Sequence, residues 1–341
     1  MTRAQAHRRV ALAAVGIALL AALFFTLTYV LNRASASDGG HWAWIASLRY
    51  LITLPLLLPL MRFQGGMAPV LRAIRAQPWA WLRCSAIGFV LFYAPLSFAA
   101  ASGPSWLVAG SFQFTVIAGM LCAPFLYRDA RRRIPPAGIA VAGVILIGVL
   151  MMQFGHASGA LDRSAWIALG CVLVAAFAFP LGNRLMLLHL ERTGEALNAT
   201  QRVFGMTLAS QPLWWLIAAY AWTAAGPPSL LQVWLAAGVA LFAAVIATIL
   251  FFQATGMVRD QPLALGAVEA MQGAEVLFAV ALGALLLGEA WPTGIALAGA
   301  LLVMKGIVRV GDRAAGRRQR PRDEDPAHRQ GRVIAPQYQR Q

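Results

Sequence analysis

The stretch PAGIAVAG at residues 136–143 returns almost unchanged as PTGIALAG at residues 292–299. Each copy begins an apolar run of helical length, and the first glycines of the two copies, Gly138 and Gly294, are 156 residues apart. That spacing is close to half of the hydrophobic part of the chain. Membrane chains built twice from one unit are typical of carriers, so the repeat predicts a transporter.

The composition indicates a chain that lies in a lipid bilayer. Hydrophobic residues make up 60% of the chain and charged residues 12%, and no water-soluble domain could bury so much apolar surface. The net charge is +15, yet the arginines lie between apolar runs and in the C-terminal tail. That pattern sets membrane topology and argues against a nucleic-acid partner. Cys84, Cys122 and Cys171 fall inside apolar runs, so we expect buried thiols and neither a disulfide nor a metal site.

Ten apolar runs are long enough to cross a bilayer. They cover about residues 10–32, 42–61, 80–102, 104–127, 136–154, 165–189, 195–223, 231–256, 262–288 and 291–309. The first run follows basic residues, as a signal peptide does. Its apolar stretch from Val10 to Leu31 is 22 residues long, which exceeds a signal core, so we interpret it as a retained span.

The arginines alternate from one loop to the next. The N-terminal segment and the loops after even-numbered spans are rich in arginine, whereas the loops after odd-numbered spans hold few. Because positively charged loops stay in the cytoplasm, both termini are predicted to be cytoplasmic and the number of spans to be even. We therefore expect a multi-pass protein of the cell inner (plasma) membrane.

The expected organisation follows from these spans. A cytoplasmic N-terminus (1–9) precedes a first five-helix repeat (10–154), an external linker (155–164), a second five-helix repeat (165–310) and a disordered cytoplasmic tail (311–341). Five spans are an odd number, so the second repeat enters the membrane from the opposite side. The predicted fold is an all-α integral membrane protein with ten transmembrane helices arranged as two inverted five-helix repeats.

Other residues support the same register between the halves. The dipeptide Asn-Arg at residues 32–33 matches the one at residues 183–184, and Arg49 matches Arg202. The small residues of the repeated motif are expected to let helices pack closely within each half.

Over residues 10–310 the chain resembles the drug/metabolite transporter superfamily, in its ten-helix exporter branch. The resemblance rests on SLRYLITLPLLLPL at residues 47–60, on the pair of spans over residues 88–127, and on LLLGEAWPTGIALAGALLVMKGIV at residues 285–308. It implies an exporter with a central cavity between the halves, lined by spans 1, 3, 4, 6, 8 and 9. The four-helix multidrug pumps of this superfamily couple to protons through an acid in their first helix. Here neither the first nor the sixth span holds an acid, so their mechanism does not transfer directly.

The ninth span contains two acidic residues, and placing an ionisable side chain in the membrane interior costs free energy. Glu269, Gln272 and Glu275 follow one another at every third residue, so they form one slanted polar stripe on a helix. The matching positions of the first half are Gln113, for Glu269, and Gly119, for Glu275. The acids are therefore specific to the second half.

Two interpretations of these acids stay open. Desolvation favours the protonated form of a carboxyl group, so Glu275 or Glu269 could bind a proton and a cationic substrate alternately. Alternatively, each acid is tied to a cation such as Arg49, or is protonated and hydrogen-bonded for structure.

Arg49 and several aromatic residues are further candidates. Arg49 could bind substrate or pair with an acid. Alternatively, it has a structural role, as an ion-pair partner or as a cap for the carbonyls of a broken helix. Arg202 is interpreted in the same way. Tyr93, Phe112 and Phe252 lie deep in their spans and could form an aromatic box for organic cations, or they could serve helix packing alone. Elsewhere, Lys305 is expected to extend to the membrane interface, and Glu289 to cap the last helix.

The leading functional prediction is a secondary exporter of hydrophobic or cationic drugs and metabolites, driven by proton antiport. The alternative is an exporter or exchanger of a small metabolite, of the amino-acid, nucleoside or sugar-phosphate class, without a multidrug role. We predict no catalytic residues, cofactor or enzymatic activity, because the chain has no histidine cluster, no G-x-S-x-G and no Walker-type loop. The expected partners are a small-molecule substrate, a proton and the bilayer. The oligomeric state, monomer or homodimer, stays open.

Overall fold

The computed structural model describes residues 3–102, 105–134, 136–154, 163–287, 291 and 293–314, and within them the chain is helical with no strand. The first half contains α1 (Arg3–Ser37), α2 (Trp42–Phe63), α3 (Ala68–Ala76), α4 (Pro78–Ser85), η1 (Ala86–Val90), α5 (Leu91–Ser102), α6 (Ser105–Phe112), α7 (Thr115–Leu126), η2 (Ala130–Arg132) and α8 (Pro136–Phe154). The second half contains α9 (Arg163–Thr193), α10 (Ala199–Ala225), α11 (Leu230–Val239), η3 (Ala240–Ala247), α12 (Thr248–Met257), α13 (Pro262–Ala270), η4 (Met271–Gly273), α14 (Ala274–Leu287) and α15 (Gly294–Ala314). The tail beyond residue 314, most of the linker 155–164 and Glu289 lie outside the described residues.

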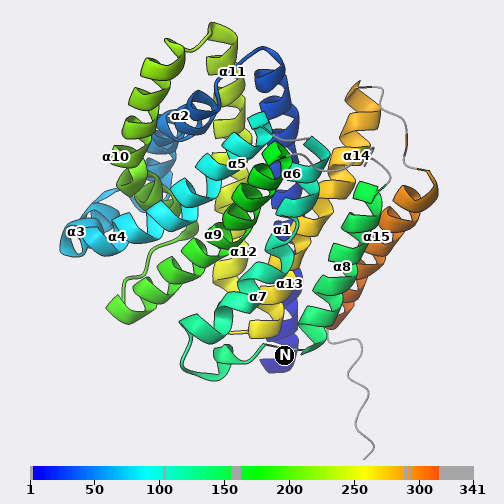
Figure 1. Ribbon diagram of the computed structural model, residues 1–341. Coiled ribbons are helices and arrows are strands. Elements are labelled where there is room, and N and C mark those ends of the chain that lie inside the picture. The colour runs from blue at the N-terminus through cyan, green and yellow to red at the C-terminus, as the bar shows by residue number, and fades with distance from the viewer. Residues whose placement is uncertain are drawn as a thin grey trace, which may run out of the picture.

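The helices form a single bundle in which the start of α1 and the end of α15 lie toward the same end (Figure 1). Six helical stretches in the described part are long and apolar enough to cross a bilayer. They are His7–Thr28, Trp42–Phe63, Pro78–Ala101, Arg163–Thr193, Leu230–Met257 and Pro262–Leu282. Two shorter apolar helices cover Gly110–Leu126 and Gly138–Met152. Their length and composition are those of an integral membrane protein.

The ends of the helices follow ordinary capping chemistry. Asn198 begins α10 with a capping box, in which its side chain accepts from the backbone N–H of Gln201 and the Gln201 side chain accepts from the backbone N–H of Asn198. Ser229 caps α11 in a similar way through the N–H of Gln232. Helix α10 ends at Gly226, whose φ of 73° suits glycine. These caps fix where two long helices begin and where one of them ends.

The second copy of the repeated motif lies at a contact between the two halves of the chain. Helices α8 and α15 run side by side (Figure 1) and meet through glycines on both helices. A Cβ on Gly148 would lie 2.7 Å from the carbonyl oxygen of Gly299, and one on Gly299 would lie 2.8 Å from the amide nitrogen of Met152. Our expectation of close packing within each half was therefore wrong for Gly299, because this glycine brings the last helix of one half against the last helix of the other.

Irregular helical segments occur at matching places in the two halves. The π-helical segments η1 and η3 interrupt the third long helix of each half, and their first residues, Ala86 and Ala240, are 154 positions apart. The next helix of each half is also broken, at Gln113–Phe114 between α6 and α7, and at the 3₁₀ turn η4 between α13 and α14. Such breaks inside apolar helices are typical of functional sites, because they free backbone groups and redirect side chains.

Candidate substrate and ion site

Five phenylalanines meet in the interior of the bundle. Phe25, Phe92, Phe112, Phe179 and Phe251 come from α1, α5, α6, α9 and α12. The ring centroids lie 4.7 Å apart for Phe92–Phe179, 5.3 Å for Phe179–Phe251, 5.8 Å for Phe92–Phe112 and 6.0 Å for Phe25–Phe179. All five side chains are buried. We call this group the phenylalanine cluster, and it lies where helices of both halves converge.

Of the aromatic residues singled out from sequence, Phe112 belongs to the cluster. Tyr93 lies beside it, with its ring centroid 5.7 Å from that of Phe92. Phe252 is not part of the cluster, and its ring centroid lies 6.2 Å from that of Phe89. Phe25 and Phe179 were not predicted, because a phenylalanine in an apolar helix carries no sequence signal that separates a site from ordinary packing.

An unsatisfied polar side chain lies next to the cluster at a helix break. Gln113 follows Phe112 directly and is 1% exposed. Neither its amide oxygen nor its amide nitrogen has a hydrogen-bond partner among the described residues, and the same is true of the Thr115 hydroxyl two positions later. A buried polar group left unpaired costs about 1–3 kcal/mol. Two such residues at one break therefore indicate a place where a ligand or water binds.

The matching break in the second half carries the predicted polar stripe. Gln272 lies in η4 and Glu275 in the first turn of α14, and both are buried. The Thr26 hydroxyl on α1 donates to the Ala22 carbonyl at 2.8 Å and to the Glu275 carbonyl at 3.4 Å. The first helix of the chain is therefore seated directly against this break.

Glu269 forms a buried ion pair with Arg184 of α9. Arg184 Nε donates to Oε1 at 2.8 Å and Nη2 donates to Oε2 at 2.7 Å, with side-chain exposures of 4% for the arginine and 1% for the acid. A Cβ on Gly119 of α7 would overlap this carboxylate, so the missing side chain makes room for it. The cation that holds Glu269 is thus Arg184, and the sequence pattern had marked that residue only as part of a repeat.

A close contact between two helices positions Arg184. A Cβ on Gly88 of η1 would lie 3.1 Å from the Cα of Gly182, which precedes Asn183 and Arg184 in α9. The Asn183 amide donates to the Thr255 hydroxyl at 3.0 Å. The glycines allow α9 to touch η1, and the asparagine fixes its rotation against α12.

The two arginines of the predicted repeat pair have similar surroundings. The Cζ atom of Arg49 lies 4.0 Å from the centroid of the Tyr93 ring. The Cζ atom of Arg202 lies 5.4 Å from the centroid of the Phe252 ring. Arg202 also donates to the Phe252 carbonyl, as expected of a cap for a distorted helix. None of the ion pairs between described residues involves Arg49. Lys305 is exposed on α15.

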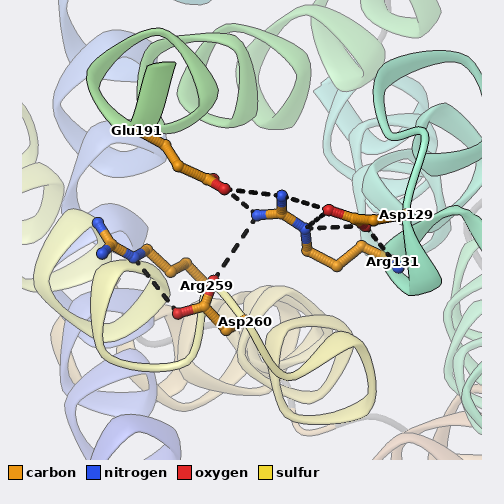
Figure 2. Close-up of polar contacts among 5 residues, drawn as sticks. All are labelled: Asp129, Arg131, Glu191, Arg259 and Asp260. Carbon is orange, nitrogen blue, oxygen red and sulfur yellow. Dashed lines mark hydrogen bonds and ion pairs between the residues drawn. The ribbon is translucent and has the colours of Figure 1, made fainter. Parts of the chain in front are cut away.

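A second group of charges lies at the end of the bundle where α1 begins (Figures 1 and 2). Arg131, after α7, bonds Asp129 at 2.6 Å through Nη2 and Glu191 of α9 at 2.8 Å through Nη1, and its Nη1 lies 3.7 Å from Asp260, between α12 and α13. Arg259 lies 3.6 Å from the same aspartate. We call these five residues the arginine network. It ties the loop after α7, in the first half, to two elements of the second half.

The network is held by charge-assisted hydrogen bonds. Bonds from Arg131 hold the pKa of the exposed Asp129 carboxyl below its ordinary range, and the same bonds, with those to Glu191, raise the pKa of Arg131. The sequence identified these arginines only as a topology signal. Two acidic partners of Arg131, Glu191 and Asp260, lie 60 and 129 residues further along the chain, and no local pattern joins them to it.

A small pocket connects the network with the buried ion pair. Its lining includes Arg131 of the network and Arg184 of the pair, together with exposed Arg133 and Arg259 and half-buried Pro262. Its volume is about 10 Å³, which is room for about one water molecule. Tyr127 also lines it. The pair is therefore within reach of water from the end of the bundle that carries the arginine network.

Long apolar helices around a buried centre of aromatic, amide and acidic side chains are the architecture of a multi-pass membrane transporter. The chain matches the family model "EmrE: Putative multidrug resistance efflux transporter" over residues 12–314. It therefore belongs to this efflux-transporter family of the drug/metabolite transporter superfamily, which confirms the resemblance noted in the sequence.

Two curated relatives and one solved structure are similar to it. "Uncharacterized protein YjlA" of Bacillus subtilis (strain 168) is 42% identical over 304 residues, 86% of this chain and 93% of that protein. A Shouchella clausii protein, "Uncharacterized 42.1 kDa protein in intracellular alkaline protease 3'region", is 38% identical over 252 residues, 72% of this chain and 65% of that one. A crystal structure with a TM-score of 0.67 and 17% identity covers 90% of this chain and 99% of its own; that similarity concerns the fold alone.

Proposed function

We propose that this protein is a secondary exporter of hydrophobic or cationic small molecules, coupled to protons, in the cell inner membrane. The observation that carries the proposal is the phenylalanine cluster, contributed by five helices of both halves, beside the buried Gln113. Aromatic rings bind organic cations through their faces. The buried carboxyl groups of the ninth span, Glu269 and Glu275, supply the negative charge that a cation or a proton needs.

We further propose that ten spans form two inverted five-helix repeats and work by alternating access, with both termini in the cytoplasm. Matching features of the halves support this arrangement. The amides of Asn32 and Asn183, from matching dipeptides, each bond a hydroxyl on the third long helix of their own half, at 3.0 Å. The π-helical segments and the helix breaks also recur at matching places. Two halves that each hold one side of a central site can rock about it.

The alternative is an exporter or exchanger of a small anionic metabolite, of the sugar-phosphate class. It is favoured by Arg202, which is 4% exposed and whose Nη1 has no hydrogen-bond partner in the described part of the chain. A buried guanidinium with a free donor suits a phosphate or carboxylate group. The aromatic lining of the centre favours the cationic substrate over this one.

The test is transport by the purified protein in proteoliposomes with an imposed pH gradient. A panel of lipophilic cations, amino acids, nucleosides and sugar phosphates is offered, and proton movement is followed with a pH-sensitive dye. We expect cations to move protons in the opposite direction. Glu275→Gln should abolish this exchange at normal membrane levels, because it removes a buried ionisable carboxyl. Asp38→Asn, an exposed acid between α1 and α2, is the matched control and should transport normally.

Two results would overturn the proposal. Full proton-coupled transport by Glu275→Gln would exclude a coupling role for this acid. Robust movement of a sugar phosphate, with no cation moving protons, would establish the alternative.

A further inference from the structure

The ion pair between Arg184 and Glu269 is buried in the interior, although the first half of the chain has a neutral residue at the position that matches Glu269. Both partners are nearly fully buried and make two parallel hydrogen bonds. The position of the first half that matches Glu269 is occupied by Gln113, which is also buried but carries no charge. The same place in the other half is therefore filled by a neutral side chain, so packing alone does not require an ion pair.

Energy gives no better reason for the pair. Two charges lose their water when they enter the bundle, and their mutual attraction often only offsets that loss. Breaking such a pair by removing one partner is costly, whereas replacing both partners by neutral groups is often tolerated. A buried pair that adds little net stability is a candidate for a functional switch.

The pair also has a route to water. The pocket described above is lined by the buried Arg184 and by the exposed Arg133 and Arg259. Arg131 of the arginine network lines the same small space. If Glu269 were neutralised, Arg184 would lose its counter-charge and four guanidinium groups would line one pocket without it. Like charges at short range in a poorly solvated space repel strongly, so the network would be weakened.

We propose that Arg184 is an internal counter-cation, which competes with the proton and the cationic substrate for Glu269 and whose release loosens the arginine network. The inference rests on the proposed function and adds Glu269 to Glu275 as an acid on which coupling depends. A proton that binds Glu269 frees Arg184, the network opens, and the carboxyl exchanges its proton for substrate at the cytoplasmic end. The closed state re-forms when Arg184 pairs with Glu269 again.

The other titratable groups around the pair are few. Helix α7 and its end contribute Cys122 and Tyr127. Helices α8 and α12, which also pack against α13, carry no titratable residue. On α15 the cations Lys305 and Arg309 are exposed, as are Arg8 and Arg9 at the start of α1. Glu275 of α14 is the other buried acid of this span, so the experiment must distinguish the Glu269 carboxyl, paired with Arg184, from that of Glu275.

The experiment compares Arg184→Gln, Glu269→Gln, the double variant Arg184→Gln/Glu269→Gln, and Arg184→Lys. Arg192→Gln, an exposed arginine at the end of α9, is the charge control. Infrared difference spectra of the purified protein, taken after steps of pH, follow carboxyl protonation and need no substrate. Proton release on addition of tetraphenylphosphonium, a lipophilic cation, follows the exchange itself.

We expect a carboxyl band in the wild type that is missing in Glu269→Gln. In Arg184→Gln that band should appear at a pH at least about one unit higher, a change of at least about tenfold in proton affinity, because a nearby cation favours the charged carboxyl. The double variant should fold with near-normal stability but release no proton when the cation is added. Arg184→Lys should restore proton release in part, since lysine keeps the charge but loses the bidentate geometry.

The proposal fails if the band of Arg184→Gln follows that of the wild type, or if the double variant keeps proton-coupled cation exchange; either result would make the pair structural. The infrared result stands even if the wild type transports no cation. A wild type inactive on every compound would refute the proposed function alone.

Discussion

At the residue scale, the most informative side chains are the buried polar ones that lack a partner or have one from a distant helix. The side-chain amide of Gln113 has no hydrogen bond in the described structure, whereas the Glu269 carboxylate has two from a single arginine. The two residues match in the repeat, so one position carries an amide on one side and a charged pair on the other. Under the proposed function, this difference would let one half bind a proton while the other half binds polar groups of the substrate.

The role of Gln113 can be separated from stability. We expect Gln113→Leu to raise the free energy of unfolding by about 1 kcal/mol, since it removes an unpaired buried amide, and to lower transport at least several-fold. Thermal unfolding in detergent and transport in proteoliposomes measure the two effects. Gln211→Leu is the control: its amide bonds the Tyr50 and Thr207 carbonyls at 3.1 Å, so its loss should destabilise. A less stable Gln113→Leu would mean that the amide is hydrogen-bonded in the folded protein.

At the scale of elements, contacts between loops and helix ends join the two halves at the end of the bundle where α1 begins. The arginine network joins the turn after α7 to the end of α9 and to the turn before α13 (Figure 2). Its partners are largely exposed, with side-chain exposures of 39% for Glu191 and 72% for Asp260. Such contacts are easily broken by salt or by rotation of the helices, which suits a gate better than a permanent brace.

Charge exchange tests the network as a gate. Arg131→Glu should leave the network repulsive and increase the reactivity of a cysteine placed at Arg133, beside the pocket. Combining it with Glu191→Arg should restore protection, because the pair is re-formed with its charges reversed. Labelling by a charged maleimide in a background without native cysteines measures the change. Equal labelling of the wild type and both variants would exclude a gating role.

The network should not give transport its pH dependence. The pKa of Asp129 is lowered below its ordinary value of 3.8 by Arg131, so its contribution to the closed state is present at all pH values above that value. The contribution is lost only as the pH falls through the depressed pKa. Arg131→Gln should therefore change the rate of transport but not the shape of its pH profile between about pH 6 and 8. A shifted profile would place the coupling group in the network.

At the scale of the whole molecule, the two halves are held together by their last helices and meet again around the phenylalanine cluster. Gly148 and Gly299 bring the backbones of α8 and α15 into contact, while Phe92 and Phe179 bring α5 and α9 together. A rigid seam along the last helices and a compliant aromatic centre suit rocking of one half against the other.

The orientation of the molecule is tested by labelling from each side of the membrane. With the native cysteines replaced, Arg72→Cys on α3 should react only with a reagent in the cytoplasm, and Ala225→Cys at the end of α10 only with one outside. Both positions are exposed, so reactivity depends on the side alone. Labelling of both cysteines from one side would overturn the inverted arrangement, because the two positions would then lie on the same face.

The sequence by itself determined the membrane environment and the apolar helices, and it predicted a register for the internal repeat. These depend on local composition and on periodic spacing, which any window of the chain reports. It also marked Glu269, Gln272, Glu275 and Gln113 as costly polar residues in apolar helices, and all four are buried. Each of these inferences needs only the length of a helix and the free-energy cost of placing a polar group in lipid.

Only the tertiary structure decided which of these residues meet. Arg184 and Glu269 are 85 positions apart, and nothing local distinguishes Arg184 from the arginines that set topology. The repeated glycines likewise predicted close packing, but only the folded chain showed that Gly299 packs against Gly148 of the other half. Helix rotation and the choice of neighbours depend on long-range packing, which a pattern along one chain does not contain. Gly299 of the second copy therefore lies at the contact between the last helices of the two halves, and the proposed chemistry lies where the two halves differ.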